Sequence, residues 1–125
     1  MSSPLPAPWL YTGPSEAALK LHFVGKSLSD CQTPAAVLDV AAIRRNCKAM
    51  LDCIRDLGVH FRAHVKTHKT VQLARLQVGE NSKDIRLIAS SVAEVEHLVP
   101  YLLESKAKGS VVNVSVIRAL TASIR

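Results

Sequence analysis

The amino-acid sequence predicts an α/β fold, in which parallel strands form a sheet and helices pack outside it. Short strand-like apolar segments alternate along the chain with segments whose apolar residues recur every three or four positions. Hydrophobic residues make up 48% of the chain and aromatic residues only 4%, so the core must be mainly aliphatic. A length of 125 residues suffices for one ordinary domain with one core.

Residues 1–32 are expected to form a proline-rich arm and connector that precedes the regular elements. Pro4, Pro6, Pro8 and Pro14 are incompatible with a long helix or a regular strand ladder. A short helix is expected to begin near Ser15. The first residues lack the basic start and apolar segment of a secretory signal, and no apolar run is long enough to cross a membrane.

Residues 33–107 are expected to form the domain, beginning with a strand at 36–38. Asp39 is a good N-cap for the helix that follows, and Gly58 stands where a left-handed residue ends it. One apolar stripe is expected on this helix, formed by Ile43, Cys47, Met50, Leu51, Ile54 and Leu57.

A second strand is expected at 59–66, because apolar and polar residues alternate there. Either Thr67 or Thr70 caps the next helix, which runs to about residue 78 and ends at Gly79. The sequence therefore predicts a second strand–helix unit.

A third strand is expected at 85–89, and Ser91 and Glu94 have the spacing of a capping box before another helix. Pro100 should kink that helix or divide it in two. Residues 108–125 are expected to be a divergent tail that supplies a fourth strand and little more. The stripe of the third helix is formed by Val92, Val95, Leu98, Val99, Leu102 and Leu103.

The segment 60–69, HFRAHVKTHK, is rich in basic side chains. Strand alternation places one apolar set toward the helices and Arg62, His64 and Lys66 on the opposite face. The apolar set is Val59, Phe61, Ala63 and Val65. Lys66 would lie at the carboxyl end of the strand, partly desolvated among positive groups. Such a lysine loses preference for the ammonium form and is a suitable nucleophile toward a carbonyl.

Two other interpretations of this segment remain open from periodicity alone. It can be an edge strand whose polar side faces water, with Arg62, His64 and Lys66 as plain surface residues. His64 and His68 can also be considered as a metal pair, because residues four apart share a helix face. They straddle a strand-to-loop junction, however, so that helix geometry is not expected.

The formal charge of +6 raises the possibility of a nucleic-acid partner. Lys and Arg are dispersed along the chain, without a long run and without interleaved aromatics, so no nucleic acid and no membrane is expected as a partner. Cys31, Cys47 and Cys53 have no metal-ligand spacing and are expected to be reduced thiols in a cytoplasmic protein.

The sequence resembles the start of the D-serine dehydratase and D-threonine aldolase family, which shares the alanine-racemase N-terminal barrel. The family hallmark is a segment like R-x-H-x-K-T-H-K, which residues 62–69 match as RAHVKTHK. The residues IASSVAEVEHL resemble the family's third strand and following helix. The resemblance covers residues 20–107 and implies the N-terminal part of a (β/α) TIM-type barrel, incomplete, with about three βα units. Further matches are FVGK at 23–26, Thr33-Pro34-Ala35, Leu38-Asp39, Asn46 and Met50.

The resemblance also implies roles for individual residues. Lys66 corresponds to the Schiff-base lysine that holds pyridoxal 5'-phosphate, and Lys69 is the competing candidate. His64, Arg62, Thr67 and His68 are expected to help bind the cofactor. No metal ligand is expected in this chain, and zinc is expected only in a missing C-terminal domain.

The implied activity is that of a D-amino-acid lyase that converts D-serine to pyruvate and ammonia, with this chain as a truncated form. The alternatives are a D-threonine aldolase and a non-catalytic, pyridoxal-phosphate-binding or inactive fragment. A small D-amino acid is the expected substrate, and family barrels commonly pair as homodimers.

Overall fold

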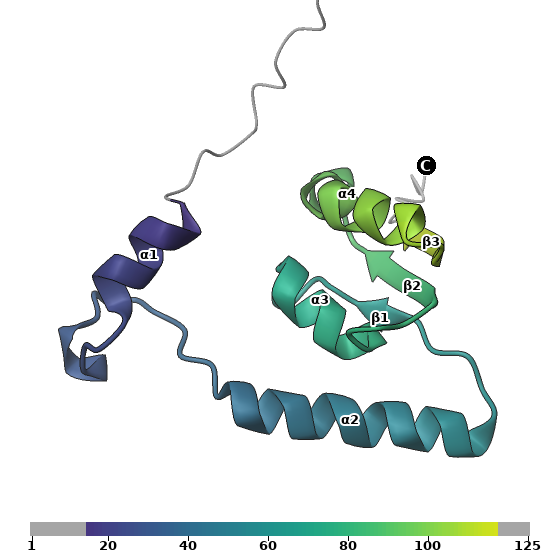
Figure 1. Cartoon of the computed structure of the whole chain (residues 1–125), viewed down its shortest axis with the longest axis horizontal. Coiled ribbons are helices and arrows are strands. Elements are labelled where there is room, and N and C mark those ends of the chain that lie inside the picture. Colours follow the sequence, from purple (N-terminus) through teal and green to yellow (C-terminus); the bar gives the residue numbers. More distant parts are fainter. Residues whose placement is uncertain (1–14, 118–125) are drawn as a thin grey trace, which may run out of the picture. The chain divides into compact units, whose positions relative to one another are not determined.

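The computed structural model describes residues 15–117, which form a mixed α/β structure (Figure 1). The chain divides into two compact units, Met1–Val37 and Leu38–Arg125. The proline-rich segment 1–14 and residues 118–125 lie outside the described residues.

The first unit contains the helix α1, Glu16–Phe23, and the short 3-10 turn η1, Leu28–Asp30. The Ser15 hydroxyl caps α1 by accepting from the Ala18 N–H at 3.2 Å, so the helix predicted near Ser15 is confirmed.

The second unit contains a parallel sheet of three strands in the order β1-β2-β3. β1 is Ala63–His64, β2 is Asp84–Ala89 and β3 is Val111–Val116. Leu87 of β2 lies opposite Ala63 on one side and Val114 on the other. The predicted α/β class, the parallel pairing and the late extra strand are confirmed for the described residues.

Three helices accompany the sheet: α2, Val40–Leu57; α3, Val71–Val78; and α4, Val92–Ala107. The Asp39 carboxylate accepts from the Ala42 N–H at 3.0 Å. Gly58 ends α2 with φ 64°, a left-handed conformation that glycine adopts without a Cβ penalty. Both predicted caps of α2 are therefore confirmed.

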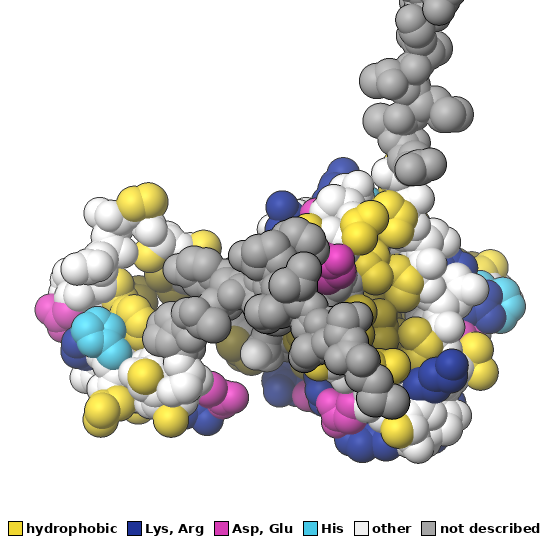
Figure 2. Space-filling view, turned by 90° about the horizontal axis from the view of Figure 1, so that it is seen from above, with side chains coloured by type: hydrophobic (Ala, Val, Ile, Leu, Met, Phe, Trp, Pro, Cys, Tyr) yellow, Lys and Arg dark blue, Asp and Glu magenta, His cyan; other side chains and the backbone are white. Residues whose placement is uncertain are grey.

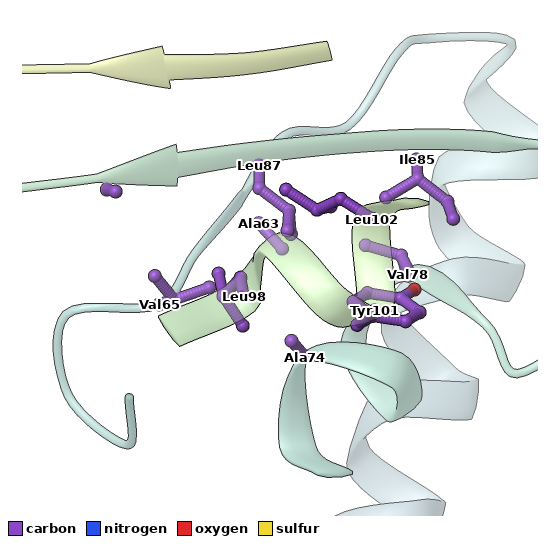
Figure 3. Packing of buried hydrophobic residues seen from close by; sticks show 10 residues of the cluster. Ala63, Val65, Ala74, Val78, Ile85, Leu87, Leu98, Tyr101 and Leu102 are labelled. Atoms are coloured by element: carbon purple, nitrogen blue, oxygen red, sulfur yellow. The ribbon is translucent and has the colours of Figure 1, made fainter. Parts of the chain in front are cut away.

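The core lies between the sheet and the helices α3 and α4 (Figure 3). Val65, Leu87 and Leu98 are its largest fully buried side chains. Leu87 and Ala63 point from the sheet toward Leu98 and Leu102 of α4 in Figure 3. The alternation predicted for 59–66 is thus correct in direction, because its apolar residues nearest the carboxyl end face the helices.

Two predicted strands differ in the structure. Residues 36–38 form no strand and are exposed, and the sheet within residues 15–117 consists of β1, β2 and β3. The strand expected over 59–66 is reduced to Ala63–His64, the part that pairs along β2. Among the described strands, the first half of β2, from Asp84, pairs only with β3 and not with β1.

The helix α4 continues through Pro100, so of the two predicted outcomes the division in two is wrong and the kink stays a prediction. Its stripe is only partly buried: Leu98 and Leu102 lie in the core, whereas Val92 and Leu103 are exposed. None of the helices within residues 15–117 is long and apolar enough to cross a membrane. On the face drawn in Figure 2, Lys and Arg side chains are dispersed among other residues rather than gathered in one patch.

Candidate functional site

The face of the sheet opposite α3 and α4 carries the polar side chains of β1 and its approach. Ala63 and Val65 are fully buried on the helix side, so alternation places Arg62 and His64 on the opposite, open face. Both residues are half-buried. They are therefore not the plain surface residues of the edge-strand interpretation, although β1 does lie at an edge of the three-stranded sheet.

The Arg62 side chain crosses the open face to reach β3. Its guanidinium donates to the Asn113 Oδ1 at 2.6 Å and more weakly to the Leu87 carbonyl oxygen at 3.3 Å. A third contact, at 3.4 Å, reaches the Asn113 carbonyl oxygen. Arg62 thus links the first strand to the third by passing over the middle one.

Lys66 follows directly after the buried Val65, at the carboxyl end of β1. The Val65 N–H donates to the Ile88 carbonyl oxygen at 3.0 Å, and the Lys66 N–H donates to His64 Nδ1 at 3.2 Å. These bonds fix the backbone on which Lys66 stands. Within residues 15–117, no carboxylate lies within ion-pair distance of the Lys66 ammonium.

The expectation that Lys66 is partly desolvated is wrong for this chain, because the residue is exposed. The physical reason is the small size of the described sheet. Three strands leave their second face open, whereas a closed barrel would surround the same position with further strands.

Lys69 occupies a different environment from Lys66. Its backbone is left-handed, with φ 52°, which costs a non-glycine residue about 1 kcal/mol or more. Its N–H donates to the Val65 carbonyl oxygen at 2.8 Å, and its ammonium lies 3.6 Å from the Glu94 carboxylate.

Glu94 is the most buried charged side chain near this loop, with its side chain 8% exposed. Its second carboxylate oxygen accepts from the Ser90 N–H at 2.8 Å, while the Ser91 hydroxyl accepts from the Glu94 N–H at 3.3 Å. Ser91 and Glu94 therefore behave nearly as their spacing predicted, except that the carboxylate takes the N–H one residue earlier. Glu94 connects the loop after β2 with Lys69 in the loop after β1.

His68 is occupied on both ring nitrogens. Its Nδ1 accepts from the Thr70 N–H at 3.1 Å, and its Nε2 lies 2.9 Å from Gln77 Oε1 on α3. His64 Nδ1 likewise accepts a backbone N–H, so the two imidazoles face separate partners. The metal-pair interpretation has no support in this geometry. Of the two predicted caps for α3, Thr70 is correct, since its hydroxyl accepts from the Leu73 N–H at 3.4 Å.

Asp84 and Arg86 form an ion pair at the amino end of β2, the end of the sheet away from Lys66. A hydrogen bond from Arg86 holds the pKa of Asp84 below its ordinary value, assisted by the charges of Arg86, His60 and Arg62. Asp84 begins β2, whereas Lys66 follows the carboxyl end of β1. This carboxylate is thus occupied at the amino edge of the sheet, away from Lys66.

The structure brings the predicted site residues together only in part. Arg62 and His64 share the open face, Lys66 and the exposed Thr67 stand at its carboxyl edge, and His68 turns toward α3. Sequence reasoning missed the partners that hold these residues, Asn113, Gln77 and Glu94. Their side chains carry no spacing signal that links them to the 62–69 motif, although S-x-x-E spacing did mark Glu94 as a capping residue.

Comparison with known proteins supports the family resemblance. The chain is 41% identical over 96 residues to a D-serine dehydratase of Schizosaccharomyces pombe, a match that covers 77% of this chain and 23% of that protein. It is 33% identical over 70 residues to a D-serine dehydratase of Dictyostelium discoideum, with 54% and 18% covered. A 3-hydroxy-D-aspartate aldolase of Paracoccus denitrificans is 40% identical over 53 residues, with 42% and 14% covered.

No family model and no solved structure matches the chain. The chain spans less than a quarter of the length of these three curated relatives. Two of these relatives are named D-serine dehydratase and one 3-hydroxy-D-aspartate aldolase, and both names are those of enzymes that act on D-amino acids. The similarity is therefore to one group of proteins, and the chain belongs to the D-serine dehydratase and D-threonine aldolase family.

Proposed function

We propose that this chain carries the cofactor-attachment segment of a pyridoxal-phosphate-dependent D-amino-acid lyase of the D-serine dehydratase type. Lys66 is the residue that would hold the cofactor. The observation that carries the proposal is the contrast between two lysines in one loop: Lys69 faces the buried carboxylate of Glu94, whereas Lys66 has no carboxylate partner within residues 15–117.

The residues present fit the aldehyde end of pyridoxal phosphate. That group requires a primary amine on a fixed backbone, with space around the amine for a ring. Lys66 supplies an exposed amine on a backbone tied to β2 and to His64. The absence of a neighbouring carboxylate matters because an ion pair would hold the amine in its unreactive ammonium form.

When bound, pyridoxal phosphate supplies an electron sink for charge that develops at the substrate Cα. The chain's own residues would orient the group. His64 uses Nδ1 to accept the Lys66 N–H, so its neutral ring carries a proton on Nε2 that can be donated on the open face. Arg62 places a positive charge on the same face, fixed by its bonds to Asn113 and Leu87. Cofactor contacts by Arg62, His64 and Thr67 remain predictions, whereas both ring nitrogens of His68 already have protein partners.

We further propose that residues 33–107 and the strand that follows are part of a TIM-type (β/α) barrel. Strands β1, β2 and β3 are parallel and follow the order of the chain, and α3 and α4 pack on one face only. These features are those of consecutive units of a barrel wall, in which the open face would become the interior. A homodimer, a zinc-bearing further domain and a cytoplasmic location complete the proposal by analogy with the family.

A second candidate activity is the retro-aldol cleavage of a D-β-hydroxy amino acid. Its support is the similarity to a 3-hydroxy-D-aspartate aldolase. The products distinguish the two activities, because D-serine gives pyruvate and ammonia whereas D-threonine would give glycine and acetaldehyde. None of the residues that the structure describes selects between them.

The test is covalent trapping of pyridoxal phosphate on the purified chain. Absorbance spectra are recorded with the cofactor before and after borohydride reduction, and the modified lysine is located by peptide mass spectrometry. Lys66→Arg and Lys69→Arg are the matched variants, since each keeps the charge and removes one amine. We expect modification at Lys66 that is lost in Lys66→Arg alone. Equal modification of surface lysines in all three proteins would show that Lys66 has no special reactivity.

A further inference from the structure

The loop that carries Lys66 is held by hydrogen bonds at both of its ends. At its start, Val65 and Lys66 are tied to β2 and to His64. At its end, the Lys69 N–H donates back to the Val65 carbonyl oxygen at 2.8 Å, which closes a single turn. Lys69, the last residue of this turn, has a left-handed backbone, with φ 52°. A conformation that L-residues disfavour persists only where surrounding contacts enforce it.

His68 supplies the contact that fixes this turn to the next helix. A backbone N–H can only donate, so the bond from the Thr70 N–H requires an unprotonated Nδ1 on His68. In the neutral ring the proton then lies on Nε2, which donates to Gln77 Oε1 at 2.9 Å in the last turn of α3. Thr70 is itself the N-cap of α3. One imidazole therefore connects the N-cap of α3 with the C-terminal turn of the same helix.

We propose that His68 is a positioning residue for Lys66, acting through Thr70 and Gln77 rather than by touching the cofactor. This inference rests on the proposed function of Lys66. Both ring nitrogens of His68 already have protein partners, so no nitrogen is left to bind a ligand. We call the His68–Thr70–Gln77 set the imidazole clasp.

The clasp matters because Lys66 and His68 stand in the same short turn. If His68 loses its partners, the end of the turn is held by the Lys69 N–H bond to Val65 and by the Lys69–Glu94 ion pair, and the left-handed Lys69 has less to enforce it. The amine of Lys66 would then sample more directions. Since reactivity depends steeply on the placement of the reacting group, we expect covalent attachment at Lys66 to slow about tenfold.

Two variants separate the halves of the clasp. His68→Asn keeps a side-chain oxygen that can accept the Thr70 N–H, in the manner of an Asx turn, but it cannot reach Gln77. Gln77→Leu removes the acceptor on α3 without altering the loop. His68→Ala removes both contacts, and His97→Ala, an exposed histidine of α4, is the control for loss of an imidazole elsewhere.

The first measurement does not involve the cofactor. Long-range proton–nitrogen NMR of the imidazoles should show the proton of His68 on Nε2 and a bare Nδ1. Amide hydrogen exchange at Thr70 should become about tenfold faster in His68→Ala and return close to the wild-type rate in His68→Asn. A proton on Nδ1, or unchanged Thr70 exchange in His68→Ala, would overturn the proposal.

The second measurement is the rate of pyridoxal-phosphate trapping at Lys66. We expect a decrease of about tenfold in His68→Ala, a smaller decrease in Gln77→Leu, and the wild-type rate in His97→Ala. Unchanged rates in His68→Ala and Gln77→Leu would also refute the positioning role. If the wild-type chain shows no selective trapping at Lys66, the proposed function fails, while the NMR and exchange data still decide whether the clasp exists.

Discussion

Leu87 offers the most direct test of the core between the sheet and the helices. It lies on the middle strand, is fully buried, and packs in one cluster with Ala63, Leu98 and Leu102. Leu87→Ala removes three carbon atoms, which corresponds to about 2.4 kcal/mol at about 0.8 kcal/mol per buried carbon. The cavity that remains adds a further cost, so we expect a total loss of about 3–4 kcal/mol. Small domains are stable by only about 5–15 kcal/mol, so this is a large share.

Leu103→Ala is the matched control, because it removes the same atoms from a leucine that is 62% exposed. Less than half of the transfer energy applies there, and alanine is the better helix former, so we expect a loss of about 1 kcal/mol or less. Urea denaturation followed by circular dichroism measures both free energies of unfolding. Equal losses for the two variants would refute the assignment of Leu87 to a packed core.

Two further predictions concern α4. Ser91→Ala removes the N-cap hydroxyl of this helix and should lower the free energy of unfolding by about 1 kcal/mol, whereas Ser91→Gly should lower it by only a few tenths of a kcal/mol. Equal losses for the two variants in urea denaturation would contradict the role of Ser91 as the N-cap. Hydrogen bonds, first from Lys108 and then from Arg75, lower the pKa of Glu104 in the folded chain. The ionised carboxylate therefore stabilises the folded chain at any pH above the carboxyl pKa of the unfolded chain. This stabilisation is lost as the pH falls through the lower pKa of the folded chain. Melting temperatures from about pH 7 to about pH 3 should therefore fall less in Glu104→Gln than in wild type, and an equal fall in both proteins would contradict this stabilisation.

Local signals in the sequence predicted local structure well. Asp39 and Gly58 bound α2 as expected, because capping depends on the residue itself and its nearest backbone groups. The alternation around Ala63 correctly predicted which side chains face the helices, because successive side chains of a strand point to opposite faces of the sheet. These features need no knowledge of distant parts of the chain.

Features that depend on distant partners were predicted less well. The apolar residues 36–38 have strand-like character, yet they form no strand, because a strand also requires hydrogen-bonding partners from elsewhere in the chain. Tyr101 became a core residue although the expected stripe of α4 omitted it, because it packs beneath Arg75, whose guanidinium lies 4.7 Å from the ring centre. Burial also raises the pKa of the Tyr101 hydroxyl. Periodicity on one helix cannot reveal a neighbour on another.

The candidate site shows the same contrast between local features, which were predicted, and distant partners, which were not. The motif at residues 62–69 predicted a strand end with Lys66 as its last residue; the structure ends β1 at His64 and places Lys66 in the turn that follows, next to the buried Val65. The partial desolvation predicted for Lys66 is wrong, because the exposure of this residue depends on how many strands surround it. The partners Asn113 and Gln77 were not predicted either, since a hydrogen bond between side chains far apart in the sequence leaves no local pattern.

The order β1-β2-β3 has a consequence for how this sheet can be made. Each strand pairs with the one synthesised just before it, so no strand has to be inserted between two that are already joined. Contacts therefore accumulate in the direction in which the polypeptide leaves the ribosome, each new strand requiring closure of only one helix-containing connection. Such a sheet can grow by one repeat at a time during translation, and its newest strand always presents the open ladder to which the next would add.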